Sequence, residues 1–139
     1  MEPAYTTTPT RRTGMRKFFS IFLLVVFLIL DIIFYWRYFY VFGEGVKAGE
    51  LNFLVKKGYV FKTYEGKLIQ SGIRSRTAGS IQSYEFDFSV ANDRIANILM
   101  LNSGKHFELH YKEYMGTLPW RGHSKYIVDS IINMQELQR

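Results

Sequence analysis

Residues 84–114, YEFDFSVANDRIANILMLNSGKHFELHYKEY, change their apolar period twice, and this change decides the fold. The first seven, YEFDFSV, alternate so that the aromatic residues and Val90 share one face, which is typical of a half-buried strand. The last ten, KHFELHYKEY, alternate in the same way and predict a second strand. The segment between them has apolar residues at helical spacing, with Asn92 as a candidate N-cap and Gly104 as a candidate end. We therefore expect a strand, a short helix and a strand in succession.

Three further strands are expected on either side of this stretch. GELNFLVKKGYVFKTYEGKLIQSG is rich in β-forming residues, and it predicts strands 50–55 and 59–70 joined by a turn at Lys56-Lys57-Gly58, with a bulge or bend at Gly66. GIRSRTAGSIQS predicts a polar loop, and SKYIVDSIINM predicts a last strand, or a strand that runs into a short helix. This order predicts a mainly β domain over residues 50–139, a small OB-like five-stranded barrel with one helix after the third strand. The alternative is a small α+β sheet with the helix packed on one face.

The apolar stretch FFSIFLLVVFLILDIIFYW, Phe18–Trp36, predicts a transmembrane helix. At ~1.5 Å per residue it would rise roughly 28 Å, close to the ~30 Å hydrocarbon core of a bilayer. Fifteen of its nineteen residues are Ile, Leu, Val or Phe. Together they favour insertion by about 7 kcal/mol, against a cost of at most about 3 kcal/mol for Asp31. We expect Asp31 to reach the headgroups or to pair with Arg37; a helix–helix contact or an ion-pathway role is the alternative.

The flanks of this helix predict a single-pass signal anchor. Residues 1–17 are Thr-rich, carry four Lys or Arg against one acidic residue, and predict a disordered basic tail. After the apolar run, YWRYFYVF forms an aromatic belt that places Trp36 and Arg37 at the interface, so the anchor covers residues 18–42. A glycine-bearing neck is expected at 43–49. The basic residues before the helix favour a cytoplasmic N-terminus and a domain outside the cytoplasm.

The charge and the cysteine content disfavour several classes of function. The net charge is +6, but residues 43–139 contain 13 Lys or Arg against 10 Asp or Glu, which leaves +3 on the predicted domain. A nucleic-acid binder is expected to carry a stronger basic stripe, so nucleic acid is disfavoured as a partner. The chain has no cysteine, which excludes disulfides and thiol chemistry.

The stretch VFGEGVKAGE, Val41–Glu50, is close to the glycine pattern of a dinucleotide-binding turn. That pattern requires a strand before it and a helix after it, so that a pyrophosphate can sit on the helix N-terminus. Here an apolar helix precedes the glycines, a strand follows them, and the spacing before the last glycine is one residue too long. We therefore predict a neck at this position and no nucleotide cofactor.

Candidate binding residues gather in MGTLPWRGHSK, Met115–Lys125, and near the turn between the first two strands. In an OB barrel these two loops border the ligand face. Aromatic and basic side chains there could hold an acidic or aromatic partner, since Trp and Arg are frequent in binding hot spots. The alternative is that Pro119 and Gly122 shape the turn while Trp120 caps the end of the barrel. The candidate partner-binding residues are Lys62, Tyr64, Trp120, Arg121, His123 and Lys125.

The only metal-like pattern is formed by His106, Glu108 and His110. In a strand these side chains would stand about 6–7 Å apart, with about 13 Å between the outer two, so one zinc ion could not hold all three at ~2 Å. Two of them could chelate together with His123, but the polar outer face of a strand explains the pattern better. We predict no metal site and no catalytic residues, because no nucleophile motif or phosphate loop occurs.

Four segments, GEGVKAGELNFLVKKGYVFKTYEGKL, FDFSV, LHYKEY and LPWRGHSKYIVD, resemble a family of short membrane-anchored bacterial proteins that is often labelled 6-phosphogluconate dehydrogenase. The likeness covers residues from about 35 to 129, and KTYEG and PWRG are its most specific parts. The enzyme of that name needs a full dinucleotide domain and a large helical domain, and this chain has neither. We interpret the label as misassigned, so the resemblance implies no established activity and no catalytic residues.

These observations predict a non-catalytic binding or scaffold module of the cell envelope. It would be anchored in the lipid bilayer of the inner membrane, with a cytoplasmic N-terminus and a periplasmic domain that binds a protein, peptide or glycan. One alternative is a nucleic-acid-binding OB domain, if the barrel is cytoplasmic. The other is an enzyme, as the family label would imply. We also expect residues 43–139 to fold without the anchor.

Overall fold

The computed structural model describes residues 1, 3–4, 12–70 and 84–136. The chain divides into two compact units, Met1–Trp36 and Arg37–Arg139. The polar loop predicted at 72–83 lies outside the described residues, and so does most of the N-terminal part of the predicted tail.

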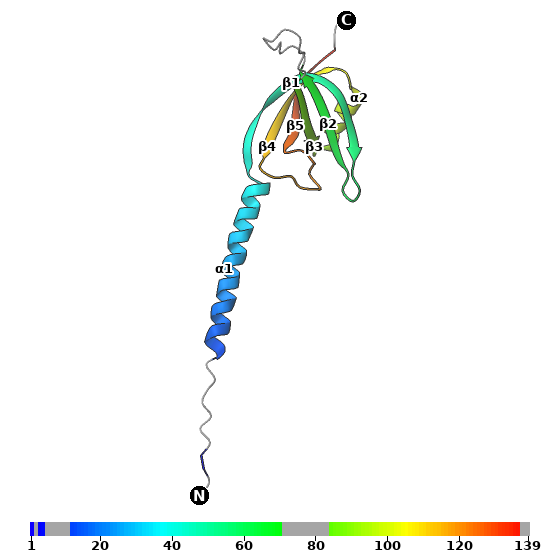
Figure 1. Cartoon of the computed structure of the whole chain (residues 1–139). Coiled ribbons are helices and arrows are strands. Elements are labelled where there is room, and N and C mark those ends of the chain that lie inside the picture. Colours follow the sequence, from blue (N-terminus) through cyan, green and yellow to red (C-terminus); the bar gives the residue numbers. More distant parts are fainter. Residues whose placement is uncertain (2, 5–11, 71–83, 137–139) are drawn as a thin grey trace. The chain divides into compact units, whose positions relative to one another are not determined.

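The helix α1, Arg12–Tyr38, comprises 27 residues (Figure 1). Its segment Thr13–Tyr38 is long and apolar enough to cross a membrane, and the most apolar part of it is not buried against the rest of the chain. A soluble protein would surround a helix of this composition with other elements. The helix includes residues 12–17 of the predicted tail, because no proline separates them from the apolar run. It ends at Tyr38, before the predicted end of the anchor at residue 42.

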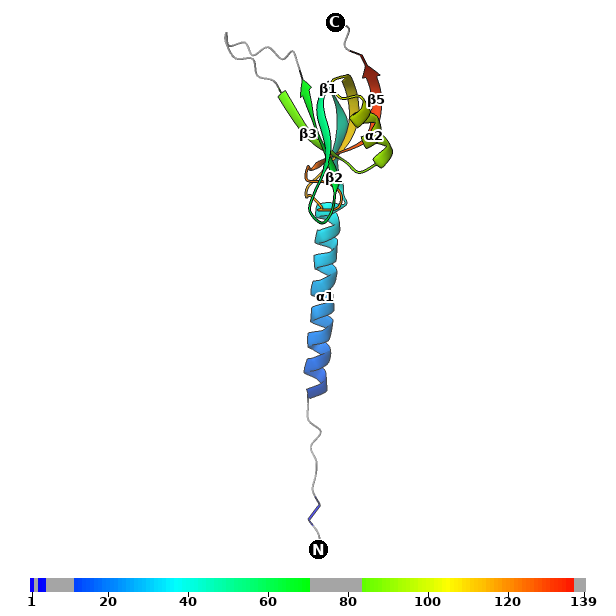
Figure 2. The same ribbon diagram turned by 90° about the vertical axis from the view of Figure 1, so that its right-hand side faces the viewer.

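The second unit contains a β domain of five strands and one short helix, α2. The elements are β1 Val41–Lys57, β2 Thr63–Gln70, β3 Tyr84–Val90, α2 Asp93–Leu101, β4 His106–Tyr114 and β5 Tyr126–Gln135. Neighbouring strands follow the order β1-β2-β3-β5-β4, and β4 pairs in turn with β1, so the sheet closes on itself (Figures 1 and 2). All pairs are antiparallel except β3 with β5, which is parallel and joins only two positions of each strand. The prediction of a mainly β domain with one short helix behind a long apolar helix is confirmed.

Strand β1 pairs with two different neighbours along its length. From Val41 to Glu50 it pairs with β4, and from Glu50 to Lys57 it pairs with β2. The glycine-bearing segment 43–49, for which the sequence predicts a neck, is therefore part of a strand. The glycines lower its intrinsic β propensity, but β4 supplies a hydrogen-bonding partner along the whole segment.

The connection between β1 and β2 is longer than the sequence predicts. β2 begins at Thr63 rather than at Tyr59, and residues 58–62 form a loop. The register shift in this pair lies in β1, between Leu51 and Phe53. β2 begins later than predicted because Tyr59, Val60 and Phe61 are exposed and do not pack into the core.

Gly66 allows core side chains to pack closely against β2, and it does not form the predicted bulge. β2 pairs with β1 and with β3 through Gly66 without a shift in register, so the predicted irregularity is absent there. A Cβ atom at this position would lie 2.6 Å from the ring of Phe88 and 2.7 Å from Leu54 Cδ1. Only glycine leaves room for these two core side chains.

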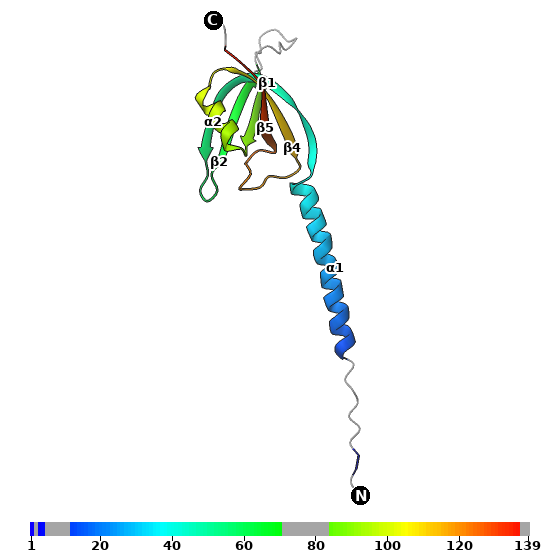
Figure 3. The same cartoon turned by 180° about the vertical axis from the view of Figure 1, so that it is seen from behind.

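The core lies inside the closed sheet. The predicted alternation is confirmed for β3 and β4, since Phe88, Val90, Phe107 and Leu109 are all buried. Helix α2 begins where Asn92 Oδ1 accepts hydrogen bonds from the first-turn amides, and it contributes buried side chains to the same core. Figure 3 shows α2 beside the strands, away from the end of the domain that carries the loops 58–62 and 115–125.

Candidate binding site between two loops

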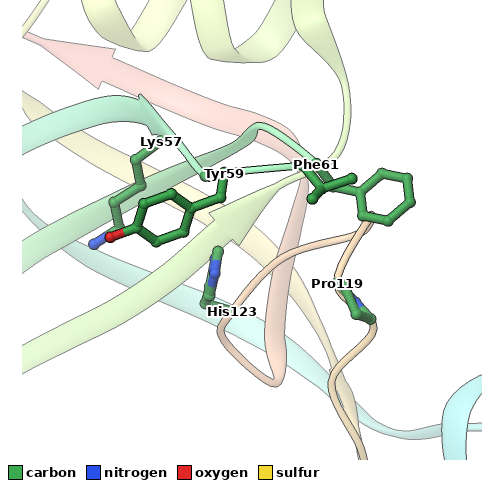
Figure 4. A pocket seen from close by; sticks show the side chains of 7 residues that line it. Lys57, Tyr59, Phe61, Pro119 and His123 are labelled. Atoms are coloured by element: carbon green, nitrogen blue, oxygen red, sulfur yellow. The ribbon is translucent and has the colours of Figure 1, made fainter.

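Two loops meet at one end of the β domain and enclose a pocket of about 440 Å³. One is the loop 58–62 between β1 and β2, and the other is the loop 115–125 between β4 and β5 (Figures 1 and 2). Figure 4 shows side chains from both loops around the pocket. The lining residues are Lys57, Gly58, Tyr59, Val60, Phe61, Pro119 and His123.

Glu65 on β2 fastens the loop 115–125 to the sheet. Its side chain is buried, and Oε1 accepts hydrogen bonds from Thr63 Oγ1 at 2.7 Å and from the backbone N–H of His123 at 2.9 Å. Oε2 accepts from Ser89 Oγ on β3 at 2.5 Å, and His123 Nδ1 lies 3.1 Å from Oε1. A buried carboxylate needs such partners to offset the loss of its hydration. Here they come from two strands and one loop, so the carboxylate joins all three.

The hydrogen bonds keep the Glu65 carboxylate charged. Burial raises the pKa of Glu65, but the hydrogen bonds from Ser89, His123 and Thr63 outweigh burial and hold the pKa below its ordinary value of 4.5. The side chain of His123 is 58% exposed, whereas that of Glu65 is 10% exposed. Glu65 therefore lies behind the imidazole ring and fixes the position of His123 in the pocket wall.

Ser89 and Gly122 press the same loop against β3. Ser89 is completely buried, and its Oγ accepts a hydrogen bond from the backbone N–H of Ser124 at 2.9 Å while it donates to Glu65. A Cβ atom at Gly122 would lie 2.2 Å from Ser89 Cβ, so a larger residue cannot occupy this position without moving the loop. The wall of the pocket is thus formed before any partner arrives.

Arg121 holds another part of the loop. Its Nη1 donates to the carbonyl oxygen of Tyr38 at 2.5 Å, and its Nη2 donates to that of Gly116 at 2.9 Å. The guanidinium group also stacks on Tyr114, 3.7 Å from the ring centroid, and its buried Nε has no hydrogen-bond partner among the described residues. Tyr38 is the last residue of α1 and belongs to the same compact unit as the β domain. Arg121 therefore acts as an internal clamp.

Exposed apolar side chains border the open side of the pocket. Tyr59 is 106% exposed, Val60 86%, Phe61 50% and Trp120 56%. The rings of Phe61 and Trp120 meet edge to face with centroids 6.1 Å apart, so the two loops are in contact. We refer to these four side chains as the apolar rim. Isolated exposed apolar residues are ordinary, whereas exposed apolar side chains in mutual contact, such as Phe61 and Trp120 here, are frequent at binding surfaces.

Two of the six predicted partner-binding residues lie at the pocket, and two more are exposed at the ends of its two loops. His123 lines it, and Trp120 belongs to the apolar rim. Lys62 and Lys125 are exposed at the ends of the two loops.

The other two predicted residues are engaged by their own domain. Tyr64 packs against the core cluster, with Lys56 Nζ 5.0 Å from its ring centroid, and Arg121 is the clamp described above. Sequence reasoning missed Glu65 and Ser89. Strand alternation places both on the outer face of the sheet, and only the distant loop 115–125 buries them.

The pattern His106, Glu108 and His110 does not gather at one point. In the part of the chain that the structure describes, no three His, Cys, Asp or Glu side chains are grouped to hold a metal ion. His110 Nδ1 instead lies 2.5 Å from Asp129 Oδ1 on the neighbouring strand β5. The pattern is thus the polar outer face of β4.

The three residues predicted for the membrane interface all belong to α1. Asp31 and Trp36 are exposed, and Arg37 lies in the last turn, where its charge complements the helix dipole. Asp31 forms no ion pair with Arg37 among the described residues, so the predicted pairing is not seen.

The means of recognition available at this site are shape, apolar contact and positive charge. Neither the loop 58–62 nor the loop 115–125 contains an acidic residue. Comparison of the chain with protein families, with curated proteins and with solved structures finds no match.

Proposed function

We propose that this chain is a membrane-anchored, non-catalytic binding or scaffold module of the cell envelope. The observation that carries the proposal is the preformed pocket between the two loops, with the apolar rim on its open side. Glu65 fastens the loop 115–125 to β2 and β3, and Arg121 fastens it to the residue that ends α1. A preformed site binds with a smaller loss of conformational entropy than a mobile one.

The β domain is best interpreted as a small OB-like barrel. Support comes from the closed order of five strands and from the position of α2 between β3 and β4. The pocket lies between the two loops that border the ligand face in OB barrels. The alternative α+β sheet would have two open edges, whereas here β4 returns to β1.

α1 serves as a single-pass signal anchor in the inner membrane, with the N-terminus in the cytoplasm and the β domain in the periplasm. The length and apolar character of α1 support the anchor, and the basic residues within 1–17 support the orientation. A compartment-sensitive reporter fused after Arg139 tests this. We expect a signal from the reporter that works outside the cytoplasm, and a cytoplasmic signal would contradict the proposed orientation.

The pocket favours a protein, peptide or glycan that presents an apolar or aromatic group beside negative charge. The rim supplies apolar contact, and Lys57, Lys62 and Lys125 supply positive charge without an acidic residue in either loop. Trp120 adds a large ring of the kind that dominates binding hot spots.

Two observations disfavour the alternative functions. OB domains that bind nucleic acid use the face of the second and third strands. Here Lys67 on that face lies 2.7 Å from a carboxylate oxygen of Glu85 and 3.6 Å from one of Asp87, so the face is not a basic stripe. For an enzyme of the labelled type, the glycines of VFGEGVKAGE would have to form a strand-to-helix turn, whereas they lie within β1.

Site-specific photocrosslinking in cells tests the binding function. A benzophenone amino acid replaces Phe61 in the full chain, and the matched control carries it at Ile132, which is 56% exposed on β5. We expect adducts from position 61 that are absent from position 132 and that weaken when Trp120→Ala is added. Identical adducts from both positions, or none from either, would show that the loop pocket is not the partner-binding surface.

A further inference from the structure

We propose that the apolar rim docks into the headgroup layer of the same bilayer that holds α1, so that the lipid surface is a ligand of the loop end of the β domain. The inference rests on the proposed function, because it takes α1 as a membrane anchor and the loop end as the binding surface. It goes further by naming a ligand and by fixing which end of the domain faces the membrane.

The short connection between α1 and β1 keeps the β domain close to the bilayer. Only Phe39 and Tyr40 separate the last residue of α1 from the first residue of β1. The three steps between Cα atoms from Tyr38 to Val41 span at most about 11 Å. Aromatic residues such as Trp36 favour the layer between hydrocarbon and water. The start of β1 therefore lies within one headgroup thickness of the interface.

Contacts within the unit Arg37–Arg139 link the rim to Tyr38, the residue that ends α1. Arg121 donates to the carbonyl oxygen of Tyr38, which ends α1, and Trp120 is the residue directly before Arg121. The ring of Trp120 contacts Phe61 in the loop between β1 and β2. One hydrogen bond, one peptide unit and one ring contact thus link the end of the helix to the rim. We infer from this link that the rim can dock beside the end of α1 while the contacts within the β domain stay intact.

The rim has the composition of a membrane-interface surface. Tyr and Trp combine an apolar ring with a polar group and prefer the interface, and Phe and Val add apolar area. The protruding tip formed by Tyr59 and Val60 is almost entirely exposed. A protruding tip can enter a fluid headgroup layer directly, whereas a protein partner would need a complementary hollow.

The charges around the rim complement an anionic lipid surface. Lys57 and Lys62 flank the loop between β1 and β2, and neither forms an ion pair among the described residues. Lys125 ends the other loop. Glu65, the acidic residue behind the pocket, is buried and fully engaged by its donors. Neither loop contains an acidic residue that would repel a phosphate group.

Fluorescence of Trp120 provides the first test. The chain has two tryptophans, so the full-length variant Trp36→Phe in lipid nanodiscs reports on Trp120 alone. We expect lipids brominated near the carbonyl region to quench its emission. The rim variant Tyr59→Ser/Val60→Ser should lose this quenching, whereas the matched surface variant Ile132→Ser should keep it. Because both variants change exposed residues, near-ultraviolet circular dichroism can verify that the domain remains folded.

A spin label provides the second test, because the chain has no cysteine of its own. The variant Val60→Cys is labelled in the full chain, and Ser103→Cys is its control. Ser103 lies in the turn between α2 and β4, where Gly104 N–H donates to Leu51 O near the middle of β1, at the end opposite the two loops (Figure 1). We expect the label at residue 60 to be reached by oxygen and shielded from a water-soluble nickel complex, with the reverse at residue 103. Equal access of the nickel complex to both labels would overturn the proposal.

Varying the charge of the lipid tests whether the lysines contribute to docking by electrostatic attraction. In nanodiscs with phosphatidylglycerol, Lys57→Gln and Lys62→Gln should each lower the ratio of docked to undocked label at residue 60 by about fivefold. In nanodiscs of phosphatidylcholine alone the same substitutions should have little effect. An identical effect in both lipids would contradict the role assigned to the lysines.

The experiments distinguish a failure of the lipid docking from a failure of the proposed binding function. A water-exposed label at Val60 together with a protein adduct at Phe61 would overturn only the lipid docking. A lipid-shielded label without any protein adduct would support the docking and remove a protein partner from the proposed function. A label shielded from both oxygen and nickel indicates contact with protein, which would also overturn the docking.

Discussion

Replacement of Glu65 by glutamine should release the loop 115–125 from the sheet and destabilise the β domain. The substitution keeps the shape of the side chain but removes the charge that accepts hydrogen bonds from Thr63, Ser89 and His123. A hydrogen bond to a charged group contributes about 1.5–3 kcal/mol, and Ser89 Oγ already accepts from Ser124 N–H. A loss of about 2 kcal/mol lowers the melting midpoint of a domain of ~100 residues by roughly 8–15 °C.

The pH dependence of this loss identifies its cause. Because the folded-state pKa of Glu65 lies below 4.5, its stabilising contribution is fully present above that pH and is lost as the pH falls through the folded-state pKa. The difference in melting midpoint between the wild-type chain and Glu65→Gln should therefore be largest at neutral pH and shrink in acid. The measurement is near-ultraviolet circular dichroism of the full chain in nanodiscs between pH 7 and pH 3.

Glu85→Gln is the matched control, since it makes the same chemical change on the adjacent strand β3. Its side chain is half exposed and pairs with Lys67 at the surface, where ion pairs contribute little to stability. We expect a much smaller shift in the melting midpoint for this control. If Glu65→Gln and Glu85→Gln lowered the midpoint equally, or if the effect of Glu65→Gln did not depend on pH, the assigned role of the buried carboxylate would be refuted.

Three further substitutions test the packing of the domain. Phe88→Ala removes a ring that is 1% exposed and should lower the free energy of unfolding by about 3–5 kcal/mol. A melting midpoint lowered by less than about 4 °C would contradict this prediction. The control Phe53→Ala changes a side chain that is 38% exposed and should lower the free energy of unfolding by less. Gly66→Ala places a Cβ against the core and should cost about 1–3 kcal/mol, whereas Gly14→Ala, which meets no atom within 4 Å, should leave the midpoint of the β domain unchanged. Arg121→Lys cannot reproduce the two carbonyl contacts and the ring stacking together, and it should cost about 1–2 kcal/mol in chemical denaturation; a wild-type midpoint would show that the clamp is dispensable.

Local sequence patterns predicted the elements that are recognisable from their own residues, namely strands with alternating apolar residues and a helix with a capping residue. The alternation in 84–90 and 106–114 predicted β3 and β4, and the capping residue Asn92 predicted the start of α2. The segment 43–49 was predicted as a neck because it lies between an apolar helix and a strand, and the partner that pairs with it, β4, lies far along the chain. Period-two patterns carry no information about such a distant partner.

The candidate site shows the same limit. The two loops around the pocket were predicted from the expected order of strands, and Trp120 and His123 lie where that order places them. Glu65 was missed because alternation puts it on the outer face of β2, and its burial depends on a loop more than fifty residues later. Arg121 was predicted to face a partner, since the sequence does not distinguish an arginine that binds a ligand from one that binds carbonyl groups of its own chain.

The pairing of β1 with β4 sets a delay in the biogenesis of the protein. Val41 emerges from the ribosome soon after α1, but its partner Tyr114 follows 73 residues later, the difference between the two residue numbers. At roughly 5–20 residues per second of synthesis, the first half of β1 waits about 4–15 s with its backbone unpaired. During that interval the unpaired nascent strand can bind chaperones or mispair, so the folding of this domain is completed only after β4 and β5 have been synthesised.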